Sequence, residues 1–324
     1  MAARIWLAGA TGYIGRALGR EMAARGHEVT ALVRSASSVD TATEAALADC
    51  RRLTVDLTSP AALATALQGE PVDAVFSCIA SRTGVAKDAW RIDHRANAHL
   101  LAAAQRAGAR QFVLLSAICV QRPLLAFQHA KLAFERELMG ADLGWTIVRP
   151  TAFFKSLAGQ VERVRSGKPF LVFGDGELTA CKPIGEADLA SYLADCLDAP
   201  DRQARILPIG GPGPAITPRQ QGELLSRLAG VEPRIRSVPV RLFDVAEMAL
   251  GACGRFSGKL AAKAELARIG RYYATESMLL WDETAQAYDA AATPETGSET
   301  LEAFYNRVLR EGLAGQELGA AKVF

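Results

Sequence analysis

The first fifteen residues combine a short apolar run with three closely spaced glycines. Residues 5–8 are apolar, and Gly9, Gly12 and Gly15 lead into an amphipathic segment over residues 13–25. Glycine allows a tight turn, close approach of the main chain to a pyrophosphate, and close packing of the following helix. The pattern therefore predicts a strand, a phosphate-binding turn and a helix whose free amides point at phosphates.

The first half of the chain alternates short β-branched runs with helical periodicity. The expected strands cover residues 5–8, 29–33, 53–55, 74–78, 112–115 and 146–148, and the expected helices cover residues 13–25, 61–67, 90–108 and 124–139. Such alternation is typical of right-handed crossovers between parallel strands. It predicts an α/β chain with a doubly wound parallel sheet, the NAD(P)-binding Rossmann fold.

The pattern loosens after Pro150. We expect a turn at residues 174–176, a helix over 186–197, a loop at 210–214 and a helix from Pro218. Two regions follow from this change: residues 1–155 as an NADP-binding core, and residues 156–324 as a smaller substrate-binding region interleaved with returning elements of the core.

Residues 240–267 place several apolar side chains on one helical face. They are Leu242, Val245, Ala246, Ala249 and Cys253. This face could pack in the core, line a large apolar pocket or rest on a membrane surface.

Composition excludes several classes of protein. Half of the 324 residues are hydrophobic and the net charge is +2, without long basic runs, which disfavours nucleic acid as a partner. No apolar stretch approaches the ~20 residues of a spanning helix, and the start of the chain has no signal-peptide layout, so we expect a cytoplasmic protein. The six cysteines and four histidines stand singly, so no metal site is predicted.

The residue after the second strand indicates which nicotinamide is bound. An Asp or Glu there would accept hydrogen bonds from the ribose of NAD, but this chain has Arg34 followed by Ser35. A guanidinium pairs with a 2′-phosphate that a carboxylate would repel, so NADPH is the expected cofactor. By analogy with the fold, further cofactor contacts are expected from Asp56, Leu57, Ala80 and Ser81.

The glycine spacing and strand order resemble the short-chain dehydrogenase/reductase superfamily. Its familiar members use a Tyr-x-x-x-Lys pair, but this chain has Phe127 at the tyrosine position and keeps Lys131. Phe127 has no proton to give to a carbonyl oxygen, which disfavours ketone reduction. Reduction of a C=C bond conjugated to a large π-system remains, because hydride on the terminal carbon leaves charge that delocalises into the ring. Water or Lys131 could then protonate the inner carbon.

Several longer blocks resemble the divinyl chlorophyllide 8-vinyl reductases of phototrophs. They cover residues 112–121, 127–131, 149–156, 173–176, 207–213, 269–274, 309–312 and 314–319. The resemblance implies NADPH-dependent reduction of the 8-vinyl group of a 3,8-divinyl chlorophyllide or protochlorophyllide to ethyl, in chlorophyll or bacteriochlorophyll biosynthesis, without flavin or an iron–sulfur cluster. Plastid forms carry a targeting extension that is not seen here, so a bacterial origin is expected.

The resemblance also implies roles for individual residues. Lys131 would hold the nicotinamide ribose, and Ser116 occupies the position of the superfamily's catalytic serine. The pyrophosphate would be bound by Gly9, Thr11, Gly12, Tyr13, Ile14 and Gly15, and the 2′-phosphate by Arg34. The nicotinamide would be bordered by Pro150 and Phe153, and the macrocycle would stack on Phe153 or Phe154, with core packing as the equal alternative for either ring. The sequence does not show how the propionate is held, and the candidates are Arg241, Arg268 and Arg271.

Two other hypotheses remain open from the sequence. A non-catalytic NADP-binding regulator of the NmrA type would also keep the glycine turn and lose the tyrosine. A subunit that assembles a respiratory complex would need a stable protein partner. Retention of Lys131 favours the enzyme.

Overall fold

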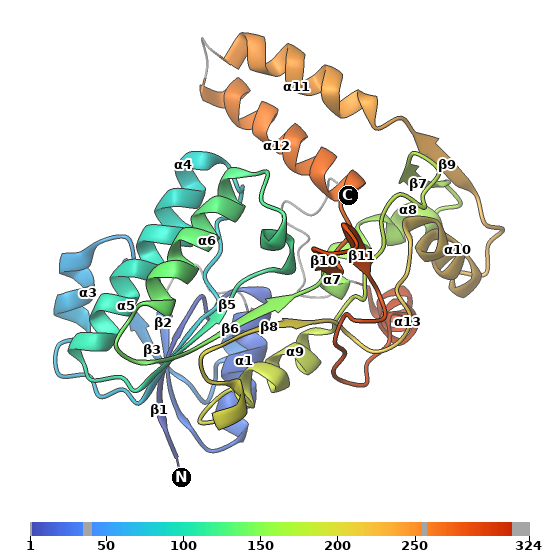
Figure 1. The fold of residues 1–324 in the computed structure, drawn as a ribbon. Helices are drawn as coiled ribbons and strands as arrows, with labels where there is room; N and C mark the ends of the chain where they lie inside the picture. Colours follow the sequence, from blue (N-terminus) through green and yellow to red (C-terminus); the bar gives the residue numbers. More distant parts are fainter. Residues whose placement is uncertain (1, 35–40, 255–257, 313–324) are drawn as a thin grey trace.

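A parallel sheet of seven strands forms the centre of the molecule (Figure 1). The computed structural model describes residues 2–34, 41–254 and 258–312. The strand order is β3-β2-β1-β4-β5-β6-β8, and every neighbouring pair is parallel. The strands are β1 (Arg4–Ala8), β2 (Glu28–Val33), β3 (Arg51–Thr54), β4 (Ala74–Ser77), β5 (Gln111–Leu115), β6 (Gly144–Pro150) and β8 (Arg205–Ile209). The order reverses next to β1, so the predicted doubly wound fold is confirmed.

Helices cover both faces of this sheet. On one face α1 (Tyr13–Ala24) and α9 (Glu186–Ala194) bury Leu18 and Leu189 against Leu7 and Phe76 of the strands. The other face is covered by α3 (Pro60–Ala66), α5 (Asn97–Arg106) and α6 (Ala126–Met139). Short α2 (Thr41–Ala46) lies between β2 and β3. The three layers form the main core of the molecule, with one apolar cluster on each face of the sheet. Because the strands are parallel, their carboxyl ends lie along one edge.

The segment expected as one helix over residues 90–108 is interrupted. It consists of a π-helical stretch η2 (Trp90–Ala96) and α5, and α4 (Ala86–Ala89) directly precedes it. π-Helical turns are rare and occur often at functional sites. The extra residue in each turn rotates the side chains of η2 relative to a regular helix, and Asp93 faces the sheet edge.

The C-terminal half adds a second, smaller core. It is built around the parallel pair β7 (Phe170–Phe173) and β9 (Ile235–Val238) with α8 (Val161–Arg165), α10 (Pro218–Leu228) and α13 (Leu301–Glu311). The hairpin of β10 (Leu280–Asp282) and β11 (Ala287–Asp289) lies beside it. Short helical turns complete the chain: η3 (Ile118–Gln121), α7 (Phe154–Leu157), η4 (Ala158–Gln160) and η5 (Pro200–Arg202).

Two long helices, α11 (Arg241–Gly254) and α12 (Gly258–Thr275), pack against each other and extend from this half of the molecule (Figure 1). On α11, Leu242, Val245 and Met248 are 59%, 57% and 70% exposed. Core packing of this face, the first of the three alternatives, is therefore wrong for Leu242 and Val245. The Cys253 side chain lies outside the described residues. Within the described ranges, no helix is both long and apolar enough to cross a bilayer.

The division between residues 155 and 156 stays a prediction, although elements of the second region do return to the first. β8 pairs with β6 at the edge of the main sheet, and α9 packs on α1. The helix expected over residues 186–197 ends at Ala194, and the one from Pro218 is confirmed. The strand β8 is absent from our sequence expectations.

Candidate active site

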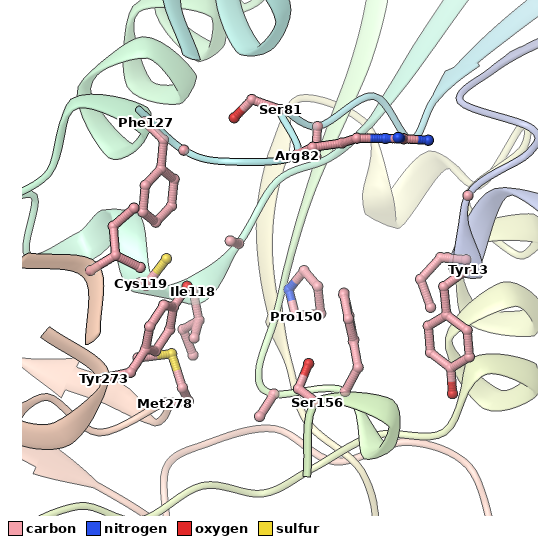
Figure 2. Close-up of a pocket in the computed structure, with 18 of the residues that line it drawn as sticks. Tyr13, Ser81, Arg82, Ile118, Cys119, Phe127, Pro150, Ser156, Tyr273 and Met278 are labelled. Atoms are coloured by element: carbon pink, nitrogen blue, oxygen red, sulfur yellow. The ribbon is translucent and has the colours of Figure 1, made fainter. Parts of the chain in front are cut away.

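A cavity of about 1180 Å³ lies at the carboxyl edge of the main sheet and continues toward the C-terminal half (Figure 2). Ligand pockets in proteins commonly have volumes of ~300–1,000 Å³, so this cavity is slightly larger than that range. Most of the predicted site residues line it: Gly9, Thr11, Gly12, Tyr13, Ile14, Gly15, Arg34, Asp56, Leu57, Ala80, Ser81, Ser116, Lys131, Pro150 and Phe153. Ser35 lies outside the described residues.

The glycine turn forms one end of the cavity. Gly9 has a φ of +76°, and a Cβ on it would lie 2.5 Å from the carbonyl oxygen of Cys78. Gly12 donates its N–H to the Gly9 oxygen at 2.9 Å and is the N-cap of α1, without a side-chain cap. The first turn of α1 contains no acidic residue. Backbone N–H groups at the start of α1 are therefore available to a phosphate, and the residues fit a dinucleotide.

Gly15 gives a direct test of this turn. A Cβ at Gly15 would lie 2.1 Å from the Gly9 oxygen, so we expect Gly15→Ala to displace the turn. The expected cost is ~1–3 kcal/mol of folding stability, as for overpacked sites, together with at least about tenfold weaker dinucleotide binding. Thermal unfolding and NADPH titration measure the two effects.

Gly140→Ala is the matched control for this substitution. A Cβ at Gly140 would meet only ordinary contacts at 3.6 Å and beyond, and its φ is −90°. We expect its NADPH affinity to equal that of the wild type. Equal affinity in Gly15→Ala would contradict the role of the turn.

Arg34 and Asp56 lie at the end of the cavity that the fold assigns to the adenosine. The carboxylate of Asp56 accepts hydrogen bonds from the backbone N–H and the hydroxyl of Thr58, at 2.9 and 2.7 Å. These bonds, with Arg91 and Arg34 nearby, lower the pKa of Asp56. Asp56 thus stays an acceptor, and Arg34 supplies positive charge beside it.

Lys131 forms an ion pair that the sequence did not reveal. Its Nζ lies 3.0 Å from Oδ1 of Asp93 in η2, and the Asp93 side chain is 1% exposed. The same oxygen faces the backbone N–H of Ser81 at 3.3 Å, whereas buried Oδ2 has no hydrogen-bond partner among the described residues. The pair orients the ammonium toward the cavity, where both side chains form part of the wall.

Asn97, one turn beyond Asp93, anchors η2 to the sheet. Its amide donates to the backbone oxygen of Asp93 at 3.0 Å and its side-chain oxygen accepts from the Ser77 hydroxyl at 2.5 Å. The sequence does not single out Asp93 and Asn97, because charged and polar residues such as Arg91, His94 and Arg95 surround them. Their joint role depends on the π-helical turn, which the pattern does not show.

Ser116 is engaged in a second buried network. Its hydroxyl donates to Glu135 Oε1 at 2.5 Å, and Arg149 pairs with the same carboxylate. Glu135 lies on α6 one turn after Lys131 and is almost fully buried. The donor capacity of Ser116 is therefore already used by Glu135, so we expect a structural role for Ser116 in the cavity wall.

We expect Ser116→Ala to change stability more than turnover. Removing one hydrogen bond to a buried carboxylate costs about 1.5–3 kcal/mol. Turnover should fall by less than about tenfold, below the hundredfold or more typical of a lost acid–base group. Chemical denaturation and steady-state kinetics separate these effects, and a hundredfold fall in kcat with unchanged stability would restore Ser116 as a catalytic residue.

The remaining predicted contacts divide into two groups. Phe153 lies on the cavity wall beside the Tyr13 ring, with 6.2 Å between the ring centroids. Phe154 instead points into the second core, where it packs on Phe304 at 5.3 Å and is 1% exposed. Arg271 pairs with Asp244 at 2.6 Å on the outside of the α11–α12 hairpin. Neither Phe154 nor Arg271 lines the cavity, so their pigment contacts stay predictions that this arrangement does not support.

The half of the cavity away from the glycine turn is mostly apolar. Its wall includes residues of β7 and α12 and of the segments that follow β7, β8 and α12: Phe170, Val172, Phe173, Leu178, Ile216, Leu266, Ile269, Tyr273 and Met278. Figure 2 shows Tyr273 and Met278 on one side with Ile118, Cys119 and Phe127, and Tyr13 on the other. Pro150 lies between these two sides.

Comparisons with known proteins agree with this geometry. A family of NAD(P)H-binding domains matches residues 9–200. A solved epimerase from Methanothermobacter thermautotrophicus has a similar fold, with a TM-score of 0.71 over 97% of this chain and 93% of that one, at 15% identity.

Curated proteins give a closer match. A protein of Oryza sativa subsp. indica, divinyl chlorophyllide a 8-vinyl-reductase, chloroplastic, is 49% identical over 99% of this chain and 82% of its own length. The protein of the same name from Cucumis sativus is 50% identical over 99% of this chain and 79% of its length. The chain belongs to the divinyl chlorophyllide a 8-vinyl-reductase family. The family resemblance and the oxidoreductase class predicted from the sequence are confirmed, and the non-catalytic alternative loses its support.

Proposed function

We propose that this protein reduces the 8-vinyl group of a 3,8-divinyl chlorophyllide or protochlorophyllide to an ethyl group, with NADPH as reductant, in chlorophyll or bacteriochlorophyll biosynthesis. The observation that carries the proposal is one cavity that joins a dinucleotide-binding turn to a large apolar wall. The relatives' names supply the pigment. Phe127 at the usual position of the acid tyrosine favours olefin over ketone chemistry.

Each part of the cofactor has candidate residues on the cavity wall. The start of α1 would bind the pyrophosphate, Arg34 the 2′-phosphate and Lys131 the nicotinamide ribose. NADPH supplies a hydride when bound. Lys131 would place its charge near the reacting carbon, held there by Asp93, while the apolar wall excludes water.

The test is turnover by the purified chain with NADPH and authentic divinyl chlorophyllide. We expect a blue shift of the Soret band and a product heavier by two hydrogens, with an ethyl group in place of the 8-vinyl group. Omission of NADPH is the control. NADPH binding without turnover would favour an NmrA-type regulator, and an alcohol product would contradict olefin reduction.

The exposed apolar face of α11 bears on where in the cell the protein acts. The pigment is largely apolar, and the exposed Leu242, Val245 and Met248 would suit contact with a membrane surface close to the cavity wall formed by α12. We propose a cytoplasmic enzyme with peripheral membrane contact, and the support is this apolar face.

A further inference from the structure

Two adjacent tyrosines on α12 have opposite surroundings. Tyr272 is 3% exposed, and its hydroxyl donates to the backbone oxygens of Cys119 at 2.9 Å and Arg122 at 3.3 Å. Tyr273 is 38% exposed and lines the cavity. Successive helical residues point about 100° apart, so one phenol anchors α12 while the other faces the ligand space.

The orientation of Tyr273 is fixed by its neighbours. Its ring meets that of Tyr272 edge-on, with 5.6 Å between centroids and 89° between planes. Its phenol interacts with the side chain of Cys119. Figure 2 shows Cys119 between Tyr273 and Phe127 on the same side of the cavity.

The helix that carries Tyr273 packs directly beside Phe127. Ile269 lies one turn before Tyr273, and both Ile269 and Phe127 pack against Gly84. A Cβ on Gly84 would lie 2.9 Å from Ile269 Cδ1 and 3.3 Å from Phe127 Cδ1. Ile269, Phe127 and Tyr272 belong to one apolar cluster. The C-terminal half thus supplies a phenol next to the position where the superfamily's acid tyrosine has been lost.

We propose that Tyr273 is the proton donor of the reduction, an assignment that rests on the proposed function. A hydride adds to the terminal vinyl carbon, the vinyl π bond breaks, and its electron pair is left on the inner carbon and delocalised into the macrocycle. The Oη–H bond of Tyr273 breaks as a C–H bond forms at that inner carbon. The phenolate then recovers its proton from water.

Other acidic groups on the wall are less suited to this step. Lys131 is paired with Asp93, and the Ser116 hydroxyl donates to Glu135. Tyr13 lies on the opposite side of the cavity (Figure 2). Enclosure in the cavity raises the pKa of the Tyr273 phenol well above its usual value, which keeps the proton in place until a stronger base, such as the carbanion, forms beside it.

The experiment compares Tyr273→Phe with Tyr272→Phe in the pigment assay. We expect kcat of Tyr273→Phe to fall at least about 100-fold, as for a lost general acid, while the Kd values of NADPH and pigment stay within about twofold. Tyr272→Phe should lower the melting temperature, because its phenol bonds the backbone oxygens of Cys119 and Arg122, and should keep kcat within about threefold, because Tyr272 does not line the cavity. A second phenol, in Phe127→Tyr/Tyr273→Phe, should recover part of the lost kcat.

Deuterium labelling adds a readout that a structural role would not change. In D₂O the wild type should place deuterium on one prochiral side of the inner carbon, and Tyr273→Phe should give both products. If Tyr273→Phe keeps the wild-type kcat and stereochemistry, the assignment of Tyr273 is overturned while the proposed function stands. A wild type without turnover would reject the proposed function, and the assignment would fall with it.

Discussion

Lys131→Met is expected to lower kcat at least about 100-fold, because loss of correct positioning near the reacting carbon has effects of that size. The ammonium lies 3.0 Å from the Asp93 carboxylate at the cavity wall. The substitution also leaves that carboxylate buried without a cation, which costs about 3–5 kcal/mol of stability. Steady-state kinetics and chemical denaturation report the two effects.

The double variant Asp93→Asn/Lys131→Met separates catalysis from folding. It removes both charges, so most of the lost stability should return, since neutral replacement of a buried pair is often tolerated. Its kcat should remain as low as that of Lys131→Met. Recovery of wild-type kcat together with stability would remove Lys131 from the mechanism and leave it a structural role only.

Arg34→Asp should reverse the preference for the 2′-phosphate. A charge-assisted hydrogen bond is worth about 1.5–3 kcal/mol, and the new carboxylate adds repulsion, so we expect the ratio of kcat/KM for NADPH to that for NADH to fall at least about 100-fold. Parallel assays with the two reduced cofactors give this ratio.

Arg106→Asp is the matched control for Arg34→Asp. Arg106 is exposed on α5 and does not line the cavity, so the same change of charge should leave the ratio near that of the wild type. An unchanged ratio in Arg34→Asp would show that specificity resides elsewhere on the cavity wall.

The local chemistry of glycine explains why the start of the fold could be predicted from sequence. The turn requires close backbone approaches at Gly9 and Gly15 that a Cβ there would prevent, and this requirement is visible in one short motif. The buried strands likewise carry continuous apolar runs, and each of the six expected segments overlaps a strand, although Val55 and Cys78 lie just beyond β3 and β4. Arg34 and Lys131 follow from their places relative to these strands.

Features that depend on tertiary packing could not be predicted. Asp93 pairs with Lys131 because it lies in a π-helical turn, whereas the apolar spacing of this segment predicts an ordinary α-helix. Tyr273 reaches the cavity because α12 folds back from the far end of the chain. Phe154 and Phe153 are adjacent aromatic residues, and only the second core around Phe304 determines which one turns inward. β8, partly exposed at the sheet edge and containing Pro208, resembles a loop.

The return of β8 to the main sheet matters to anyone who wishes to study the coenzyme-binding half alone. A fragment that stops at residue 155 would lack both β8 and α9, leaving the hydrogen-bonding groups of β6 and the apolar side chains of α1 open to other molecules. Bare strand edges of this kind promote aggregation. Expression designs should therefore extend through Ile209, so that the sheet is closed by its own last strand.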